Sequence, residues 1–572
     1  PGPPTMSSMS SPSAIEPLRI REFRTLWVAS TLSNVGSFLH AVAASWLMLQ
    51  LTGSALWVGL MVASPTLPLL FLALPAGAMA DLVDRRKILA ASYSLMGLAA
   101  AGMAALSLTD TITPPILLAL GLLLGVGLAL NLPAWQAIVP DLVPRGLVAG
   151  AVALNSASFN VARAIGPALG GAIVAAFGPG TAFLLNAASF LLVIGAVASF
   201  RQGDWKGDEE TSIFHAIGTG VRYARFTPPF RWLLLLTSLF ALSSAVVQAM
   251  LPNLTQGALG GDAVLFGLLL GAMGAGALVG AFTRQQADDL LGNHLVPASV
   301  TGFGLAGIVV GLSREPILTG VAMVAAGICW VWTLSTLNAT AQLLSPGWVR
   351  GRAMSLYTLA FVGFLPLGAV LGGALGELIG VPQAVMLLSL AGVTLGATAF
   401  RLPIPVLDQV AAPEEPADWE PGPHLDRVAG SPVLITNIFI IDEEDLGDFL
   451  EVMDQLRRVR LRTGAYRWRL YREAGDPHRM TEAFLLHSWE DHLRQHDRLD
   501  AEAVEVIRSA RRFDRSDGPL SRHLVAVDVV PAERRPEWQE LLAGHEELHH
   551  ADGSIPLQRE AAASQPRSRR VS

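Results

Sequence analysis

The chain has 572 residues, of which 52% are hydrophobic and 15% charged, and its mean hydropathy is +0.46. Soluble proteins carry about 25% charged residues, so this composition excludes an ordinary soluble protein and indicates a membrane protein. The net charge of −7 without a basic stripe argues against nucleic acid as a partner, and the single cysteine, Cys329, permits neither an internal disulfide nor a cysteine-rich metal site. We expect no metal and no cofactor. Charges are scarce between Phe23 and Leu402 and dense from Asp408 onward, so a membrane region precedes a soluble one.

Hydrophobic segments long enough to cross a bilayer begin near the N-terminus. We expect residues 1–20 to be disordered, and the apolar run from Phe23 is too long for a cleavable signal peptide. A helix needs about 20 apolar residues to cross the hydrocarbon core. Within residues 21–200, the segments of this length are 24–51, 56–80, 88–108, 114–139, 149–176 and 180–200.

A second set of apolar segments follows a polar connection. We expect residues 201–230 to form a cytoplasmic central loop, and residues 402–430, which are rich in Pro, Glu and Asp, to form a linker. Residues 231–401 contain the segments 231–254, 263–284, 294–313, 317–343, 353–378 and 382–401. The predicted membrane region is therefore all-α, with twelve helices in two six-helix bundles.

Lysine and arginine lie almost entirely in loops on one side of the predicted membrane. They are Arg19, Arg21, Arg24, Arg85, Arg86, Lys87, Arg145, Arg201, Lys206, Arg222, Arg225, Arg231, Arg284, Arg350 and Arg352. The other side holds only Arg314. Because cytoplasmic loops are enriched in Lys and Arg, we expect a multi-pass protein of the cell (inner) membrane with both termini in the cytoplasm.

Residues of the first bundle recur in the second at an offset of roughly 202–207 residues. Several pairs in register are hard to ascribe to chance, and such internal repeats are typical of transporters whose halves expose a central site alternately. The pairs are Phe23-Arg24 with Phe230-Arg231, Gly77 with Gly280, Asn131 with Asn338, Gln136 with Gln342, and Gly166, Gly170 and Gly171 with Gly368, Gly372 and Gly373.

A charged loop follows the second predicted helix. Its sequence is Gly77-Ala-Met-Ala-Asp81-Leu-Val-Asp84-Arg85-Arg86-Lys87. It resembles the signature loop of the major facilitator superfamily, Gly-x-x-x-Asp-Arg-x-Gly-Arg-Arg, at Gly77, Asp81, Arg85 and Arg86. Leu82 and Asp84 replace the usual basic residue and glycine. The resemblance implies a gating loop that clamps the cytoplasmic ends of the two halves. As an alternative, the loop only supplies the positive charge that sets orientation.

The fifth predicted helix carries the glycine-rich motif Gly166-Pro167-Ala-Leu-Gly170-Gly171. Gly166 and Gly170 form a GxxxG pair, which lets helix backbones approach closely. The motif also resembles the fifth-helix motif of exporters in the same superfamily, which implies an interface along which the halves rock. Ordinary packing of small residues is the overlapping alternative.

Polar side chains inside the spans are candidates for a central cavity, because such groups are costly in a bilayer. They are Asn34, Ser37, His40, Asn131, Gln136, Asn160, Arg163, Gln248, Asn338 and Gln342. For each, an interhelical hydrogen bond worth about 0.6 kcal/mol is the alternative. Arg163 is the strongest candidate, because a buried cation needs an anionic partner or substrate. Glu377, near the end of the eleventh span, is the only acidic residue inside the spans, and no proton carrier is assigned.

Residues 431–530 show the pattern of a soluble α+β domain. We expect a strand over 433–441, a helix over 442–463, strands over 466–471 and 482–488 around a turn at 475–478, a helix over 489–513 and a strand over 523–530. The order βαββαβ predicts a ferredoxin-like domain. Residues 531–572 form a charged, His-rich tail.

The stretch from His487 to His496 resembles the small dimeric αβ-barrel monooxygenase domains of antibiotic biosynthesis. Fold resemblance does not establish catalysis, and no metal-ligand triad is evident among its histidines. We favour a self-associating or regulatory domain over an enzyme.

The run from Asn131 to Arg145, with Ala153–Ser156 and Phe159–Pro167, is similar to the facilitator subfamily that includes the enterobactin exporter. The resemblance spans residues 18–528 and implies proton-driven export of a siderophore or another small organic molecule. The basic residue usual in the fourth helix is absent, since Gly125–Leu130 is wholly apolar. The alternatives are a membrane-tethered enzyme that modifies the exported compound and a scaffold that does not transport.

Overall fold

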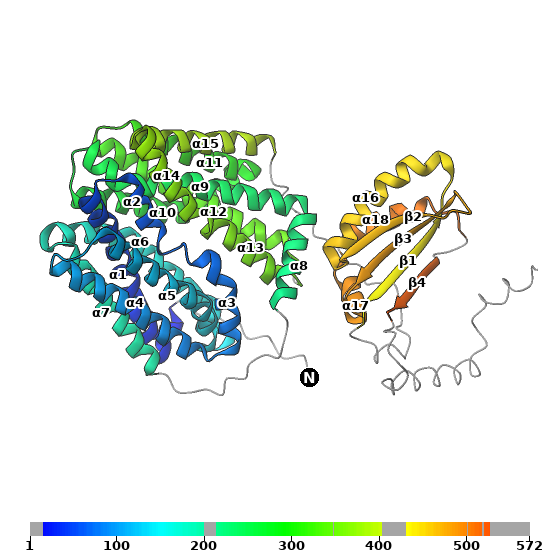
Figure 1. The fold of residues 1–572 in the computed structure, drawn as a ribbon, viewed down its shortest axis with the longest axis horizontal. Coiled ribbons are helices and arrows are strands. Elements are labelled where there is room, and N and C mark those ends of the chain that lie inside the picture. The colour runs from blue at the N-terminus through cyan, green and yellow to red at the C-terminus, as the bar shows by residue number, and fades with distance from the viewer. Residues whose placement is uncertain are drawn as a thin grey trace, which may run out of the picture. The chain divides into compact units, whose positions relative to one another are not determined.

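The structure is a computed structural model that describes residues 15–199, 213–346, 348–402, 431–499, 501–516 and 520–526. The chain divides into two compact units, Pro1–Gln409 and Val410–Ser572. The described elements of the first unit are helices, and those of the second unit form a four-stranded sheet with helices (Figure 1).

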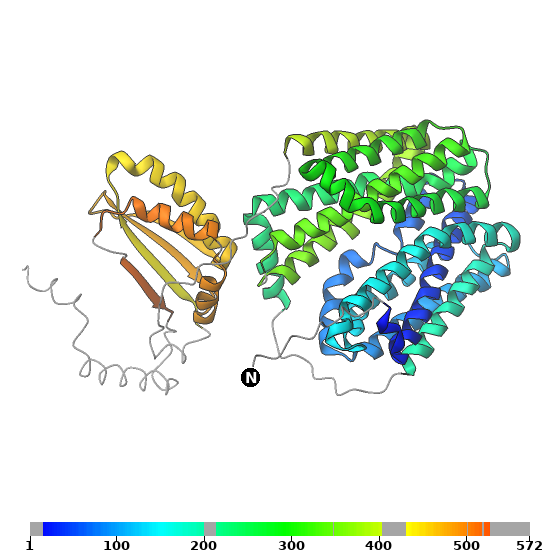
Figure 2. The same cartoon turned by 180° about the vertical axis from the view of Figure 1, so that it is seen from behind.

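The first unit contains two helical bundles, seen as the blue-to-cyan and the green helices in Figures 1 and 2. The first bundle comprises α1 (Arg21–Thr52), α2 (Ala55–Ala63), α3 (Leu69–Leu82), α4 (Arg85–Leu108), α5 (Pro114–Asp141), α6 (Val148–Phe177) and α7 (Pro179–Ala198). The second comprises α9 (Pro228–Gly257), α10 (Ala263–Leu291), α11 (Leu295–Leu312), α12 (Pro316–Leu344), α13 (Arg350–Val362), α14 (Phe364–Ile379) and α15 (Val381–Arg401).

Ten stretches of the described residues are long and apolar enough to cross a membrane. This count takes α10 and α11 as the single stretch Ala263–Leu312, and it leaves out α2 and α3, each of which is shorter than 18 residues. Pro65 and Pro68 lie between α2 and α3, and proline removes a backbone donor and ends an α-helix. The predicted span 56–80 is therefore broken, and twelve spans stay a prediction.

The predicted central loop contains a helix, α8 (Ile213–Phe226), which packs on α9 and α13. Tyr223 of α8 is 3% exposed, and its hydroxyl donates a hydrogen bond to the carbonyl of Leu344 at the end of α12. The segment predicted as a cytoplasmic central loop, residues 201–230, thus includes a helix over 213–226. The first residues of the predicted loop, 201–212, lie outside the described residues.

The second unit begins with β1 (Val433–Ile440), which is followed by the short η5 (Glu443–Asp445) and by α16 (Leu446–Thr463). Next come β2 (Arg467–Arg472), β3 (Arg479–Leu486), α17 (Trp489–Asp497), α18 (Ala501–Arg512) and β4 (Leu520–Val525). The sheet is antiparallel with the order β2-β3-β1-β4. The single helix predicted over 489–513 is split into α17 and α18, and the predicted last strand begins three residues earlier, at Leu520.

The helices of this unit cover one face of the sheet. Alternate residues of β1, namely Val433, Ile435 and Phe439, are buried, as a strand with one covered face requires. Phe439 packs with Phe449 and Met453 of α16 and with Ala510 of α18. Figure 2 shows α16 and α18 in front of the strands, which are seen from their other side in Figure 1.

Candidate functional site

A cavity of about 730 Å³ lies between α6 of the first bundle and α12 of the second. It extends from the middle of both helices toward the end of the unit where α6 begins and α12 ends, which we call the open end. Its lining residues are Ser156, Asn160, Arg163, Trp330, Val331, Leu334, Ser335, Asn338, Ala339, Gln342 and Leu343. The cavity therefore combines amide and hydroxyl groups with one cation and an apolar wall.

Among the residues that the structure describes, Arg163 is the only charged one that lines this cavity. Its guanidinium carbon lies 5.3 Å from the centre of the Phe159 ring, one helical turn earlier, in a cation–π contact. The structure gives Arg163 no ion pair with any described residue. The guanidinium can therefore offer its donors to a bound anion, for which its planar fork is well suited.

Amide side chains of both bundles lie in the same cavity. Nε2 of Gln342 donates to Oδ1 of Asn338 over 2.7 Å, and Nδ2 of Asn160 donates to the carbonyl of Ser156 over 2.9 Å. These bonds leave Oε1 of Gln342 and Oδ1 of Asn160 as acceptors without a hydrogen bond from a described group. Four of the predicted cavity residues, Asn160, Arg163, Asn338 and Gln342, are thus together.

The other predicted cavity residues lie outside this lining. His40 is 5% exposed and packs its ring 4.8 Å from that of Phe183, inside the first bundle. Asn131 is 7% exposed and donates through Nδ2 to the Ser92 hydroxyl of α4 over 3.3 Å. The remaining members, which do not line this cavity either, are Asn34, Ser37, Gln136 and Gln248.

The two bundles touch closely at the opposite end, which we call the sealed end. There α2 begins and α14 ends, and the two helices pack backbone to backbone. A Cβ atom built on Gly59 would lie 2.5 Å from the carbonyl oxygen of Ala369, and one on Gly373 would lie 2.6 Å from that of Ala55. Both distances are shorter than real Cβ contacts, so only glycine permits this packing.

An equivalent contact joins α6 to α10. A Cβ atom on Gly274 would lie 2.5 Å from the carbonyl oxygen of Arg163, and one on Gly171 would clash with that of Ala263. The neighbouring Gly170 instead faces Leu39 and Val42 of α1. The motif Gly166-Pro167-Ala-Leu-Gly170-Gly171 therefore packs both against α1 of its own bundle and against α10 of the other bundle.

The repeat seen in the sequence reappears in these contacts. Gly170 faces the first helix of its own bundle, α1, and Gly372 faces the first helix of the second bundle, α9, at Val246. Gly171 faces α10 of the other bundle, and Gly373 faces α2 of the other bundle. Equivalent glycines thus make equivalent contacts, as expected of two halves related by a twofold axis.

A carboxylate also crosses between the bundles at the sealed end. Glu377, in the last turn of α14, accepts a hydrogen bond from the Ser54 hydroxyl and one from the Leu56 backbone N–H over 3.2 Å. Ser54 is the N-cap of α2, so Glu377 caps a helix of the other bundle. The sequence showed Glu377 as the only acid inside the spans, but a contact across more than 300 residues leaves no local signal.

The predicted gating loop joins α3 to α4. Asp84, where the superfamily usually has glycine, caps α4 by accepting a hydrogen bond from the Arg86 N–H over 2.9 Å. The Arg86 guanidinium donates to the carbonyl of Val197 at the end of α7 over 3.4 Å, within the same bundle. Gly77 and Asp81 lie in α3, but their surroundings fall outside the described part, and Arg85 also interacts with other groups.

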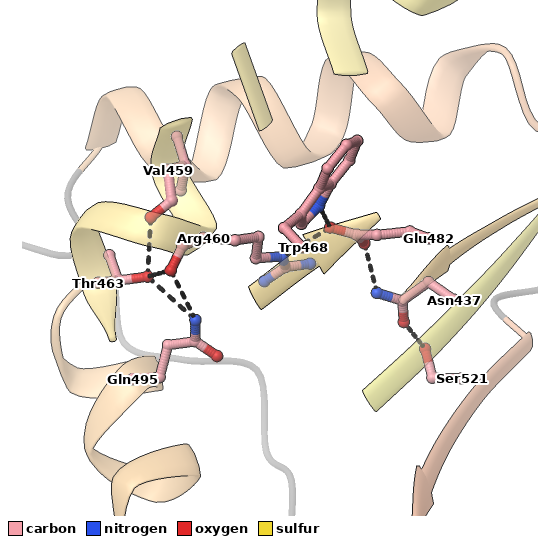
Figure 3. A network of polar contacts seen from close by, with 8 residues as sticks. All are labelled: Asn437, Val459, Arg460, Thr463, Trp468, Glu482, Gln495 and Ser521. Atoms are coloured by element: carbon pink, nitrogen blue, oxygen red, sulfur yellow. Dashed lines mark hydrogen bonds and ion pairs between the residues drawn. The ribbon is translucent and has the colours of Figure 1, made fainter. Parts of the chain in front are cut away.

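The second unit contains a buried polar network (Figure 3). The fully buried Glu482 accepts hydrogen bonds from Arg460 over 3.1 Å, from Trp468 Nε1 over 2.8 Å and from Asn437 over 2.6 Å. Asn437 in turn accepts from the Ser521 hydroxyl of β4 over 2.6 Å. The network joins all four strands to α16, and such a satisfied arrangement is typical of a structural core.

Three histidines lie beside this network. The ring of His492 in α17 is 4.8 Å from those of His496 and His523. Burial, aided by the charges of His496, His523 and Arg460, lowers the pKa of His492 to about 3. Within the described residues, no group of three His, Cys, Asp or Glu is arranged to hold a metal ion.

The model of the family described as transmembrane secretion effector, a family of major facilitator transporters, matches residues 12–530. The multidrug efflux pump Tap of Mycolicibacterium fortuitum is 26% identical over 390 residues, which cover 66% of this chain and 94% of the pump. The enterobactin exporter EntS of Salmonella choleraesuis is 28% identical over 376 residues, which cover 62% of this chain and 86% of the exporter. The staphyloferrin A transporter of Staphylococcus aureus is 22% identical over 367 residues, which cover 64% of this chain and 91% of the transporter.

Solved structures share the helical fold. A bacterial homologue of the human lysosomal transporter Spinster, inward-facing and unoccupied, aligns with a TM-score of 0.56 and 15% identity, covering 68% of this chain and 97% of that one. A peptide transporter of the POT type aligns with a TM-score of 0.56 and 12% identity, covering 66% and 93%. The chain therefore belongs to the transmembrane secretion effector family of major facilitator transporters.

Proposed function

We propose that this protein exports a small organic molecule by alternating access, with the cavity between α6 and α12 as the substrate site. The observation that carries the proposal is the asymmetry of the helical unit. A polar cavity with one arginine opens at one end, while glycine-mediated contacts close the other end. A transporter with its site open to one side only has this arrangement.

The proposed topology has twelve membrane spans in two six-helix halves. It counts α10 and α11 separately and takes α2 with α3, and α13 with α14, as spans that are interrupted at Pro65–Pro68 and at Gly363. The open end carries Arg85, Arg86 and Lys87 between α3 and α4. The positive-inside rule then assigns the open end, both termini and the second unit to the cytoplasm of a cell (inner) membrane.

The proposed substrate carries an anionic group that binds Arg163. Relatives named as siderophore and multidrug exporters support a siderophore or another small organic molecule. A guanidinium in a site of low dielectric discriminates strongly in favour of an anion. The amides of Asn160, Asn338 and Gln342 would bind the polar groups of the same molecule, and Trp330 its apolar part. We propose a proton gradient as the driving force, as the family resemblance implies.

The second unit is proposed to be a ferredoxin-like domain, which the element order and the strand order β2-β3-β1-β4 support. We propose a role in regulation or self-association rather than in catalysis. The sheet face that lacks helices, with Tyr471 and Leu524 exposed, would be the contact surface. Chemical cross-linking of the full-length protein in membranes tests this role, and a strictly monomeric protein would contradict self-association.

Transport by the purified protein in proteoliposomes tests the main proposal. We expect an imposed proton gradient to drive accumulation of at least one compound from a panel of siderophores and cationic, neutral and anionic drugs. Arg163→Gln should lower transport of anionic compounds about 10- to 100-fold, because the substrate loses its charge partner. Arg163→Lys keeps the charge without the planar fork and should retain part of the activity.

Arg401→Gln, which changes an arginine outside the cavity, is the matched control for loss of positive charge. Folded protein that transports no compound of the panel would contradict the proposal. Equal transport by the Arg163→Gln variant and by the wild type for every anionic compound would contradict the assigned role of Arg163.

A further inference from the structure

The contact between Glu377 and α2 joins the two bundles where they must separate for the sealed end to open. Glu377 belongs to α14, and both of its donors, the Ser54 hydroxyl and the Leu56 N–H, belong to the N-terminus of α2. One turn away along the same two helices, Gly373 of α14 and Gly59 of α2 allow close backbone packing. The contact therefore exists only while the sealed end is closed.

The contact is strongest with an ionised carboxylate, whose Oε1 accepts both hydrogen bonds. An ionised carboxylate is acceptor-only, and its hydrogen bonds are stronger than those of neutral groups. It also lies at the positive end of the α2 dipole, which favours negative charge. Protonation removes the charge and turns one oxygen into a donor, so it weakens both hydrogen bonds and the dipole interaction at once.

In the described helices α2, α9, α13 and α15, no charged group lies close enough to pair with the carboxylate. α2 contains no charged residue, and the only charged residues of α9 and α15 are Arg231 and Arg401. α14 runs alongside α9 with Gly376 next to Met250, so Arg231 lies about 28 Å along the helix at 1.5 Å per residue. Arg401 ends α15, about 30 Å from its start next to α14, and the arginines of α13 precede α14 at the open end. Among the described residues, Glu377 forms no ion pair.

We propose that Glu377 is a proton-binding site that controls the sealed end. As a carboxylate it holds α14 to α2, and as a carboxylic acid it releases them, so that the cavity can open on this side. Since the side chain is exposed, the proton comes from the solution on the sealed side and returns to it when the end closes. The proposal rests on the proposed function and adds a conformational control to it.

The test is a distance measurement that needs no substrate. Spin labels are placed on the exposed sites Leu51 of the first bundle and Ile317 of the second, both next to the sealed end, in full-length protein with Cys329→Ala. A glutamate ordinarily titrates near pH 4.3, so the distance is followed from about pH 3.5 to 7.5. We expect the fraction with a long distance to rise as the pH falls.

Glu377→Gln should show the long-distance population at every pH, raised about tenfold over wild type at neutral pH, as loss of a charged hydrogen bond predicts. Ser54→Ala should raise this population and keep its pH dependence. Glu315→Gln, which neutralises another acid at the same end, should behave as wild type. A wild-type distance that is independent of pH, or a Glu377→Gln variant that titrates as wild type does, would overturn the proposal.

Proteoliposome transport separates this outcome from that of the proposed function. If the protein transports a compound but the distance between the two labels does not change with pH, only the role of Glu377 is overturned. If the distance between the labels changes with pH but no compound is transported, only the proposed export function is overturned.

Discussion

The packing of α2 against α14 predicts a specific effect for Gly373→Ala. The new Cβ would lie 2.6 Å from the Ala55 carbonyl oxygen and 3.0 Å from the Leu56 Cα. Ordinary contact begins at 3.4 Å, so the helices must separate by about 0.8 Å at this point. Both partner atoms belong to backbone, so a side-chain rotation cannot relieve the clash.

Overpacking of this kind costs about 1–3 kcal/mol. The penalty falls on the conformation in which the sealed end is closed, because only this conformation brings Gly373 against Ala55. The ratio of open to closed sealed ends should therefore rise roughly 5- to 150-fold. Spin labels at Leu51 and Ile317 would report the change as a gain in the long-distance population.

Gly195→Ala is the matched control. It introduces the same methyl group into α7, where a Cβ would have no neighbour within 4 Å, and it should leave the distances unchanged. If Gly373→Ala gives the same distance distribution as Gly195→Ala, the contact does not hold the sealed end and the reasoning is refuted.

Other predictions concern single side chains, each measured by hydrogen exchange in the full-length protein. Glu482→Ala leaves the buried Arg460 unpaired and should destabilise the second unit by about 3–5 kcal/mol; a loss below about 1 kcal/mol would contradict this. His492 has a pKa of about 3 in the folded unit, below the ordinary 6.5, so the unfolded chain binds more protons and the unit should lose about 2 kcal/mol between pH 7 and 5. His492→Gln should flatten that slope, and an unchanged slope would contradict it. Asp84→Ala removes the cap of α4 and should lower protection of its first turn by about 1 kcal/mol, whereas Asp84→Asn should retain it; equal effects of the two would argue against capping.

Much of the helical architecture follows from apolar length, because a bilayer demands long apolar helices whatever their partners. The same criterion missed the break between α2 and α3, where Pro65 and Pro68 interrupt an apolar run without shortening it. It also missed α8, whose amphipathic pattern lies in a polar connection. In the second unit the strands were predicted from the element pattern around a hairpin turn, but one continuous helix was predicted where α17 and α18 are separate.

The site was harder to predict, because helical periodicity identifies a face and not its neighbour. His40 shares a face with Ser37 by spacing, yet its ring packs against Phe183. Gly170 and Gly171 are adjacent in sequence, yet they face different bundles. The role of Glu377 depends on Ser54 and Leu56, which the fold alone brings close.

The most direct test of alternating access is to measure both ends of the helical unit in one protein. One pair of labels at Leu51 and Ile317 reports the sealed end, and a second pair at Val152 of α6 and Leu290 of α10 reports the open end. On adding a transported compound, the account predicts that the first distance lengthens while the second shortens. Two distances that stay fixed during transport, or that lengthen together, would contradict it.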